Sequence, residues 1–139
     1  MPLPRIATLV ALAVIALSGC RAPAATVDTD GSQAVEALFQ AGRSDEVVEV
    51  HGVVQRSLSD DLEGSRHQRF ILRLATGRTL LVAHNIDLAD RVPLAVGDGL
   101  RIRGEYEWND QGGVLHWTHH DPAGNRPGGW IEHDGRRYR

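Results

Sequence analysis

Near the start of its polar part the chain carries one stretch with the period of a helix. Apolar Val35, Leu38 and Phe39 recur at the i, i+3, i+4 spacing that places side chains on one helix face. Ser32 precedes this stretch as a candidate N-cap, and Gly42 follows it as a stop signal. The pattern predicts one short amphipathic helix of about 10 residues.

From Val47 onward the period changes to two, which is typical of strands with one buried face. The clearest case follows the turn at Gly97-Asp98, where apolar residues alternate with Arg and Glu. Gly52 interrupts the first strand pattern and indicates a bend or bulge there. The predicted strands begin at Val47 and otherwise cover His67–Ala75, Arg78–His84, Leu100–Trp108 and Val114–His119, and a last hairpin is predicted around Trp130-Ile131 and Arg137-Tyr138.

Five short strands with a long, bent first member predict a mainly-β fold, a small five-stranded barrel with one short N-terminal helix. The oligonucleotide/oligosaccharide-binding (OB) fold is the best match to this order of elements. Its usual helix between the third and fourth strands would be reduced to the irregular segment Asp87–Val96, in which Pro93 breaks any long helix. Other small barrels and half-barrels are the alternatives.

The first residues have the pattern of an export signal. Arg5 is followed by an uncharged run from Ile6 to Gly19, which is shorter than the roughly 20 apolar residues of a membrane span. The run ends in Leu17-Ser18-Gly19-Cys20, which resembles a bacterial lipobox, where the cysteine is acylated and becomes the first mature residue. An ordinary signal peptide with an incidental cysteine is the alternative. We therefore predict a signal peptide at 1–19, a lipidated Cys20 with a flexible tether at 20–31, and one domain at 32–139.

The composition and net charge indicate which kinds of partner this protein is expected to bind. The 139-residue chain has a net charge of −3 and 15 basic residues, all of them Arg, and this balance does not indicate a dedicated nucleic-acid binder. Cys20 is the only cysteine, so the mature domain has no internal disulfide. The predicted membrane contact is the lipid anchor alone. Because Arg21 is not the aspartate associated with inner-membrane retention, we expect an outer-membrane lipoprotein of the cell envelope that faces the periplasm.

The densest chemical cluster lies in and after the fifth predicted strand. Three imidazoles and a carboxylate occur within six residues there, and these donor groups suit a zinc-like divalent ion. In the predicted barrel the third and fifth strands run parallel, so their ends meet at one rim together with the start of the second strand. The predicted metal ligands are His84, His116, His119, His120 and Asp121, and the further candidate site residues are Asp60, Asp61, His67, Gln68, Asn85 and Trp117.

Each of these residues also has an ordinary structural explanation. A histidine at a strand end is more often solvated or locally hydrogen-bonded than a metal ligand. Asp60 and Asp61 suit the capping of a turn, Asn85 suits a cap after the third strand, and the tryptophans suit packing in the core or at its rim. No Gly-x-Ser-x-Gly, P-loop or His-Glu-x-x-His template occurs, so the sequence favours a protein that is not an enzyme.

A set of motifs extends from about Val47 to the C-terminus. They are Asp60-Asp61-x-x-Gly64-x-x-His67-Gln68, His84-Asn85-Ile86, Gly97-Asp98, His116-Trp117-Thr118-His119, Gly128-Gly129-Trp130 and Asp134-Gly135-Arg136-x-Tyr138. Together they resemble an uncharacterised family of small exported bacterial proteins, the domain-of-unknown-function family 3465. The resemblance implies that the His and Asp motifs belong together, and it supplies no activity. It also implies a further histidine near Arg126, which this sequence lacks.

Three functions follow from these residues. The first is an envelope-anchored barrel that binds a small-molecule, oligosaccharide or protein ligand, with a divalent metal at the His/Asp rim in a functional or purely structural role. The second is a metal-dependent hydrolase, for example of phosphodiesters, in which a zinc-like ion activates water. The third is an oligosaccharide or nucleic-acid binding module that uses Arg73, Arg101 and Arg103 with the tryptophans, although a solvated outer face explains these arginines equally well.

Overall fold

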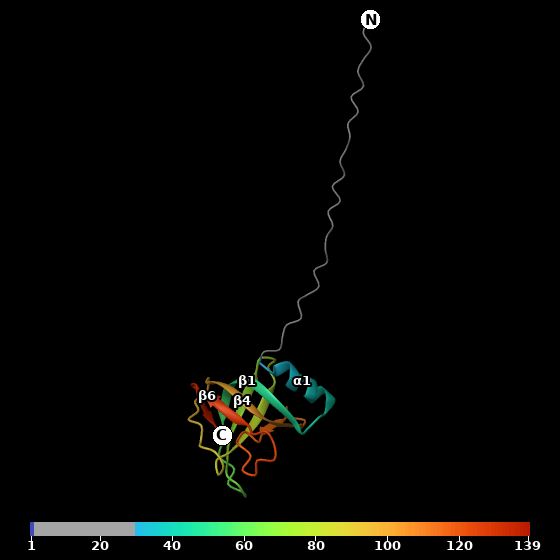
Figure 1. The fold of residues 1–139 in the computed structure, drawn as a ribbon. Coiled ribbons are helices and arrows are strands. Elements are labelled where there is room, and N and C mark those ends of the chain that lie inside the picture. The colour runs from blue at the N-terminus through green and yellow to red at the C-terminus, as the bar shows by residue number, and fades with distance from the viewer. Residues whose placement is uncertain (2–29) are drawn as a thin grey trace.

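The alternating part of the chain forms strands that close into a barrel beside one helix (Figure 1). The computed structural model describes Met1 and residues 30–139, so the predicted signal peptide, the lipobox and the acylated Cys20 lie outside the described residues. The elements are α1 (Ser32–Ala41), β1 (Glu46–Ser57), β2 (His67–Leu74), β3 (Thr79–Asn85), β4 (Gly99–Glu107), β5 (Val114–His116), β6 (Trp130–His133) and β7 (Arg136–Tyr138).

Five of these strands form a closed barrel of mixed topology. They follow the order β1-β2-β3-β5-β4, and β4 pairs back with β1 to complete the ring. β3 and β5 run parallel, whereas the other neighbours in the ring are antiparallel. The predicted mainly-β, five-stranded OB-like barrel with one N-terminal helix is therefore confirmed. β6 and β7 are additional strands, a hairpin that pairs with β4 at Arg101–Arg103.

The long first strand pairs with two neighbouring strands, β2 and β4. Gly52 pairs with Leu74 of β2 and with Leu100 of β4, and the pairing with β2 shifts register between Val54 and Arg56. A Cβ at position 52 would lie 2.6 Å from the Cγ of Leu72, so only glycine allows this close approach. The irregularity predicted at Gly52 lies a few residues further along β1, between Val54 and Arg56.

The barrel interior is filled by the apolar positions of the alternating pattern. α1 adds Val35, which is fully buried, and the helix lies beside the barrel in Figure 1. Tyr106 and Phe70 are the largest fully buried side chains. The core also contains Val48, Val50, Val54, Leu72, Leu74, Leu80, Val82, Leu100, Ile102, Leu115 and Ile131. Residues between these positions on the same strands face outward, which makes the outer face the place for polar chemistry.

Two local predictions are wrong at element ends. Ser32 is the first residue of α1 and not its N-cap, which is Gly31 in a left-handed conformation (φ 72°). The Oγ of Ser32 instead accepts the N–H of Ala75 and joins the helix to the end of β2. The fifth strand ends at His116 and not at His119, because Trp117 has a φ of 55° and cannot continue a β ladder.

The segment between β3 and β4 is irregular, as expected from Pro93, and the buried side chain of Gln68 anchors it at Val92. The amide of Gln68 donates to the carbonyl of Val92 (2.8 Å) and accepts the N–H of the same residue (2.9 Å). This pair of bonds replaces the support that a helix would supply at this end of the barrel. Among the described residues, no helix has the length and apolar character required to cross a bilayer.

Candidate functional site

The outer face of β4 carries a row of charged side chains. Arg101, Arg103, Glu105 and Glu107 alternate with buried residues of the core, so all four point away from the barrel interior. β5 pairs with this strand antiparallel, and its register places His116 directly opposite Glu105. Because residues that face each other across a ladder have Cβ atoms about 5 Å apart, the imidazole and the carboxylates meet on one surface.

Within the described residues, one group of imidazole and carboxylate side chains has the spacing of a metal site. The ligand atoms of Glu105, Glu107 and His116 all lie within 4.8 Å of one another. His116 Nε2 is 3.6 Å from one oxygen of Glu105 and 3.5 Å from one oxygen of Glu107. Ligand atoms around a tetrahedral zinc ion are separated by roughly 3.3 Å, given bond lengths of about 2.0–2.1 Å. The two distances from His116 are therefore close to the separation that a shared ion requires, and the two carboxylates lie within 4.8 Å of each other.

The nitrogen of His116 is buried between the two carboxylates without a hydrogen bond. Within the described part of the chain its Nε2 has no hydrogen-bond partner, although the imidazole ring as a whole is 35% exposed. Such a buried polar atom costs free energy unless something pairs with it. A cation between the three side chains would pair with this nitrogen and with both carboxylates.

Arg126 contacts the same group from the loop between β5 and β6. Its guanidinium forms an ion pair with Glu105 Oε2, whereas the other oxygen, Oε1, faces His116. The guanidinium also stacks 4.3 Å from the ring centroid of Trp117. Asp121 holds this loop, because its carboxylate accepts the N–H groups of Ala123, Asn125 and Arg126. Glu105 is thus oriented by a second residue while one of its oxygens stays available.

The rest of the His-Trp-Thr-His motif turns into the protein after His116. Thr118 is fully buried and His119 is 3% exposed, and the backbone of Gly129 lies against the backbone of both residues. A Cβ at position 129 would lie 2.1 Å from the carbonyl oxygen of Trp117, so the two backbones can approach only because residue 129 is glycine. The N–H of Gly129 donates to the carbonyl of His119 (2.7 Å). These contacts fix the end of β5 and the direction in which His116 points.

His84 is a buried neutral histidine with partners on both ring nitrogens. Its Nδ1 lies 2.8 Å from Thr118 Oγ1, and its Nε2 lies 3.1 Å from the carbonyl oxygen of Asp90. Burial, with smaller contributions from the neighbouring His119 and His67, lowers the pKa of His84 to about 4. A neutral ring with Nε2–H can donate to Asp90 while Nδ1 accepts the hydroxyl of Thr118. Both nitrogens therefore serve the fold in this arrangement.

The other predicted rim residues lie near His84 but make separate local contacts. His119 Nδ1 donates to the carbonyl of His120 (2.6 Å), and burial lowers the pKa of His119. His67 Nδ1 donates to the carbonyl of Ser65 (2.8 Å), and the side chain of His120 is exposed. The assignment of His84, His119, His120 and Asp121 as metal ligands stays a prediction from the sequence. The structure gives His84, His119 and Asp121 hydrogen bonds that stabilise the rim and the loop after it.

The acidic and amide candidates close turns or hold loops. Asp60 forms an ion pair with Arg91, and the carboxylate of Asp61 accepts the N–H of Glu63. The side-chain oxygen of Asn85 accepts the N–H of Asp87 (2.9 Å) at the end of β3. These are the capping roles that the sequence offered as alternatives to a functional site, and Gln68 anchors the β3–β4 segment as described above.

Glu105 and Glu107 are the site residues that the sequence interpretation missed. The signal for them was present between the fourth and fifth predicted strands, where Asn109 to Gly113 has the composition of a turn. A turn at Asn109–Gly113 pairs the strands around it in one register, and that register places Glu105 opposite His116. Counting across this turn would have added two carboxylates to a histidine that was already a candidate.

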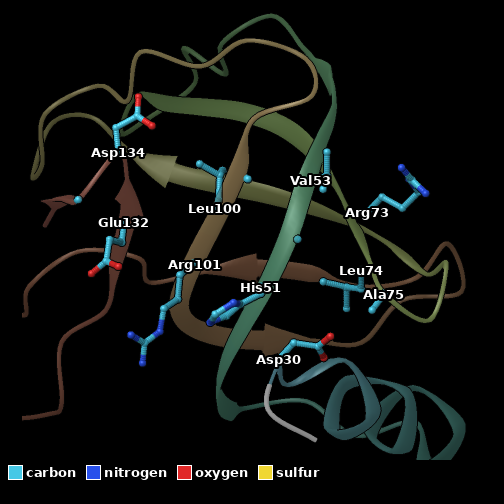
Figure 2. Close-up of a pocket in the computed structure, with 13 residues that line it drawn as sticks. Asp30, His51, Val53, Arg73, Leu74, Ala75, Leu100, Arg101, Glu132 and Asp134 are labelled. Carbon is cyan, nitrogen blue, oxygen red and sulfur yellow. The ribbon is translucent and has the colours of Figure 1, made fainter.

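A second feature of the outer face is a hollow of about 600 Å³ over β1, the ends of β2 and β4, and the β6–β7 hairpin. Figure 2 shows Arg73 and Arg101 on opposite sides of β1, with His51 between them. Glu132 and Asp134 line the same hollow. Its charged side chains carry both signs, so the hollow does not select one class of ligand.

The fold and this group define a small β-barrel protein with a candidate carboxylate and imidazole metal site. The chain belongs to the family described as Protein of unknown function (DUF3465), whose sequence pattern matches residues 13–139. The resemblance based on the His, Asp and Gly motifs is thereby confirmed. A comparison with curated proteins finds no match to this chain.

Proposed function

We propose that this protein is an envelope-anchored lipoprotein whose barrel domain binds a divalent metal ion through Glu105, Glu107 and His116. The observation that carries the metal part is the position of His116 Nε2, which is 3.6 and 3.5 Å from two carboxylate oxygens and makes no hydrogen bond with the described residues. The anchor rests on the lipobox pattern that ends at Cys20. In this view the barrel presents its metal site on the periplasmic side of the outer membrane.

The donor atoms favour a zinc-like ion. One imidazole nitrogen with two carboxylate oxygens suits zinc better than calcium or magnesium, which prefer oxygen donors throughout. Arg126 supports this assignment because it binds the far oxygen of Glu105 and so orients the oxygen that faces His116. Ligating carboxylates in proteins commonly have such a second hydrogen-bonding partner.

Metal content of the full chain tests this proposal. The protein is purified in detergent without a polyhistidine tag, stripped with a chelator, and titrated with zinc while native mass spectrometry and elemental analysis count the bound ions. We expect one zinc per chain, with the affinity reduced about tenfold or more in Glu105→Gln and His116→Ala, because each change removes one ligand. His51→Ala is the matched control, since His51 is an exposed strand histidine away from the group. A protein that takes up no zinc at micromolar concentration contradicts the proposal.

The anchor has its own test. In cells fed with labelled palmitate, the full chain is expected to carry the label and to fractionate with the outer membrane. The Cys20→Ser variant is expected to lose the label, because this change removes the acceptor sulfur. Label that persists in Cys20→Ser, or a wild-type chain without label, would rule out acylation at this residue.

A metal-dependent hydrolase is the second candidate function, and one observation favours it. Three protein ligands are the usual number for catalytic zinc, which keeps a fourth position for water or substrate. The side chains of His116 and Glu107 are 35% and 40% exposed, so an ion between them would face solvent. The test is hydrolysis of bis(p-nitrophenyl) phosphate by the zinc-loaded full chain, with Glu107→Gln as the variant. Absence of turnover with zinc bound excludes catalysis on this substrate and leaves the binding function.

A further inference from the structure

A hollow of about 420 Å³ lies beside Arg126, between the β5–β6 loop and the strands β4, β6 and β7. Its lining includes Arg103, Arg126, Arg137 and Arg139, together with His120 and Trp130, and we refer to it as the arginine pocket. The chain as a whole has a net charge of −3 and contains only 15 basic residues. A concentration of four arginines in one small hollow therefore departs from the charge balance of the protein.

The positive charge of this pocket is only partly neutralised by the protein. Arg126 pairs with Glu105, and Arg137 pairs with Glu132 at 2.9 Å. Among the described residues, no ion pair is formed by Arg103 or Arg139, and the buried Nε of Arg103 has no hydrogen-bond partner. Guanidinium donors in one hollow without enough acceptors leave a site for an anion.

Asp121 is the only acidic side chain among the described residues that line the arginine pocket, and its oxygens already accept hydrogen bonds. Asp121 accepts three backbone N–H groups of its own loop, at 3.0, 2.7 and 3.0 Å, and forms no ion pair with an arginine among the described residues. These bonds also fix the loop from which Arg126 extends. The pocket therefore contains two arginines without an ion pair, Arg103 and Arg139, and among its described residues no acidic side chain pairs with them.

Aromatic rings hold two of the guanidinium groups in place. Arg126 lies 4.3 Å from the ring centroid of Trp117, and Arg137 lies 4.1 Å from that of Trp130. A planar guanidinium that lies over an aromatic ring keeps its N–H donors in its own plane, where they remain available to a ligand at its edge. Less conformational entropy is lost when such a side chain binds a ligand, because its position is set beforehand.

We infer that the arginine pocket binds a phosphate group, as the free anion, as part of a phosphorylated small molecule, or as a lipid headgroup. The fork of an arginine matches two oxygens of a phosphate, and several arginines around one group share its charge. This inference goes beyond the metal site and does not require it, because Arg103 and Arg139 lie outside the Glu105, Glu107 and His116 group. The two sites share the Arg126–Glu105 pair, so a metal-bound ligand could extend its phosphate into the pocket.

Calorimetric titration of the full chain in detergent with inorganic phosphate tests the inference. The titration is done with chelator present, so that failure of the metal site does not affect the result. We expect saturable binding of one phosphate, weakened about tenfold or more in the double variant Arg103→Gln/Arg139→Gln, because two charge-assisted contacts are lost. The matched control is Arg56→Gln/Arg73→Gln, which removes two exposed arginines elsewhere and should bind as wild type does. Circular dichroism confirms that both variants are folded.

A second arm distinguishes the sources of the phosphate group. The full chain is reconstituted in vesicles of phosphatidylcholine alone or with phosphatidylglycerol, and the fluorescence of its tryptophans is followed on addition of inorganic phosphate. Loss of the phosphate response in phosphatidylglycerol vesicles supports a lipid headgroup, and an unchanged response supports a soluble phosphorylated ligand. The inference is overturned if inorganic phosphate gives no binding up to about ten millimolar, or if the control double variant loses binding as much as Arg103→Gln/Arg139→Gln does.

Discussion

The buried histidine of β3 makes the stability of this protein depend on pH in a predictable window. His84 is fully buried, and burial lowers its pKa from 6.5 to about 4. Its ring nitrogens contact Thr118 Oγ1 at 2.8 Å and the carbonyl oxygen of Asp90 at 3.1 Å. The test substitution is His84→Leu, which places an apolar side chain at this position and removes the titrating group.

The direction of this pH dependence follows from the number of protons that the folded and the unfolded chain bind at His84. Between about pH 4 and pH 6.5 the unfolded chain binds a proton at His84 that the folded protein does not bind. The contribution of His84 to the free energy of unfolding is therefore complete above pH 6.5 and is lost as the pH falls toward 4. A shift of this size corresponds to about 3 kcal/mol in total, of which about 2 kcal/mol is lost between pH 7 and pH 4.5.

Urea unfolding at pH 7 and pH 4.5, followed by circular dichroism, measures this contribution. Wild type should lose about 2 kcal/mol more between the two pH values than His84→Leu does. At pH 7 the variant should itself be less stable by about 1–3 kcal/mol, because the hydroxyl of Thr118 and the carbonyl of Asp90 lose a partner. Burial also lowers the pKa of His119, and that group is present in both proteins.

The exposed His51 supplies the control for this comparison. His51→Leu should keep the wild-type dependence on pH, because its side chain lies on the outer face of β1. If His84→Leu and wild type lose the same free energy between pH 7 and pH 4.5, the buried imidazole is not the source of the acid sensitivity and the reasoning fails.

Two further predictions concern the elements that shape the barrel. Gly113→Ala should cost about 3 kcal/mol in thermal unfolding, because φ is +104° and the added Cβ would lie 2.3 Å from the ring of Tyr106. Gly77→Ala, with φ +89° and no atom within 4 Å, should cost only about 1 kcal/mol, and equal losses in the two variants would mean that the ring moves aside freely. Gln68→Leu should cost about 3 kcal/mol and speed amide exchange around Val92, since it removes both hydrogen bonds between this side chain and the backbone of Val92. Unchanged exchange there would show that the segment is held by other contacts.

Much of the fold could be predicted because its signals are local. The change of period at Val47 marks the end of the helical pattern, and the alternation in Leu100–Trp108 assigns a buried and an exposed side to each residue of β4. Side chains alternate between the two faces of a strand with a repeat of two residues. This repeat is a property of the strand itself and does not depend on which strands pair with it. The order of the barrel strands then followed from their number, the long first strand and the turns between them.

The ends of elements depended on packing that the sequence pattern does not show. Val114–His119 has the composition of one strand, yet β5 ends at His116 because Trp117 adopts φ 55° while the backbone of Gly129 packs against it. Similarly, Ser32 is a favourable capping residue, but its hydroxyl accepts the N–H of Ala75 from another element. Contacts between distant segments outweighed the local preference in both cases.

The candidate site was likewise predicted only in part from the sequence, and the tertiary structure determined the rest. Sequence alone identified His116 by its residue type and by the density of histidines around it. Only the register of β4 against β5 placed Glu105 and Glu107 beside that histidine, and only the loop closed by Asp121 brought Arg126 to Glu105. Residue types and periods are properties of short stretches of chain, so they can be recognised in the sequence. The meeting of ligand atoms depends on strand register and loop closure, which are determined by the packing free energy of the whole domain.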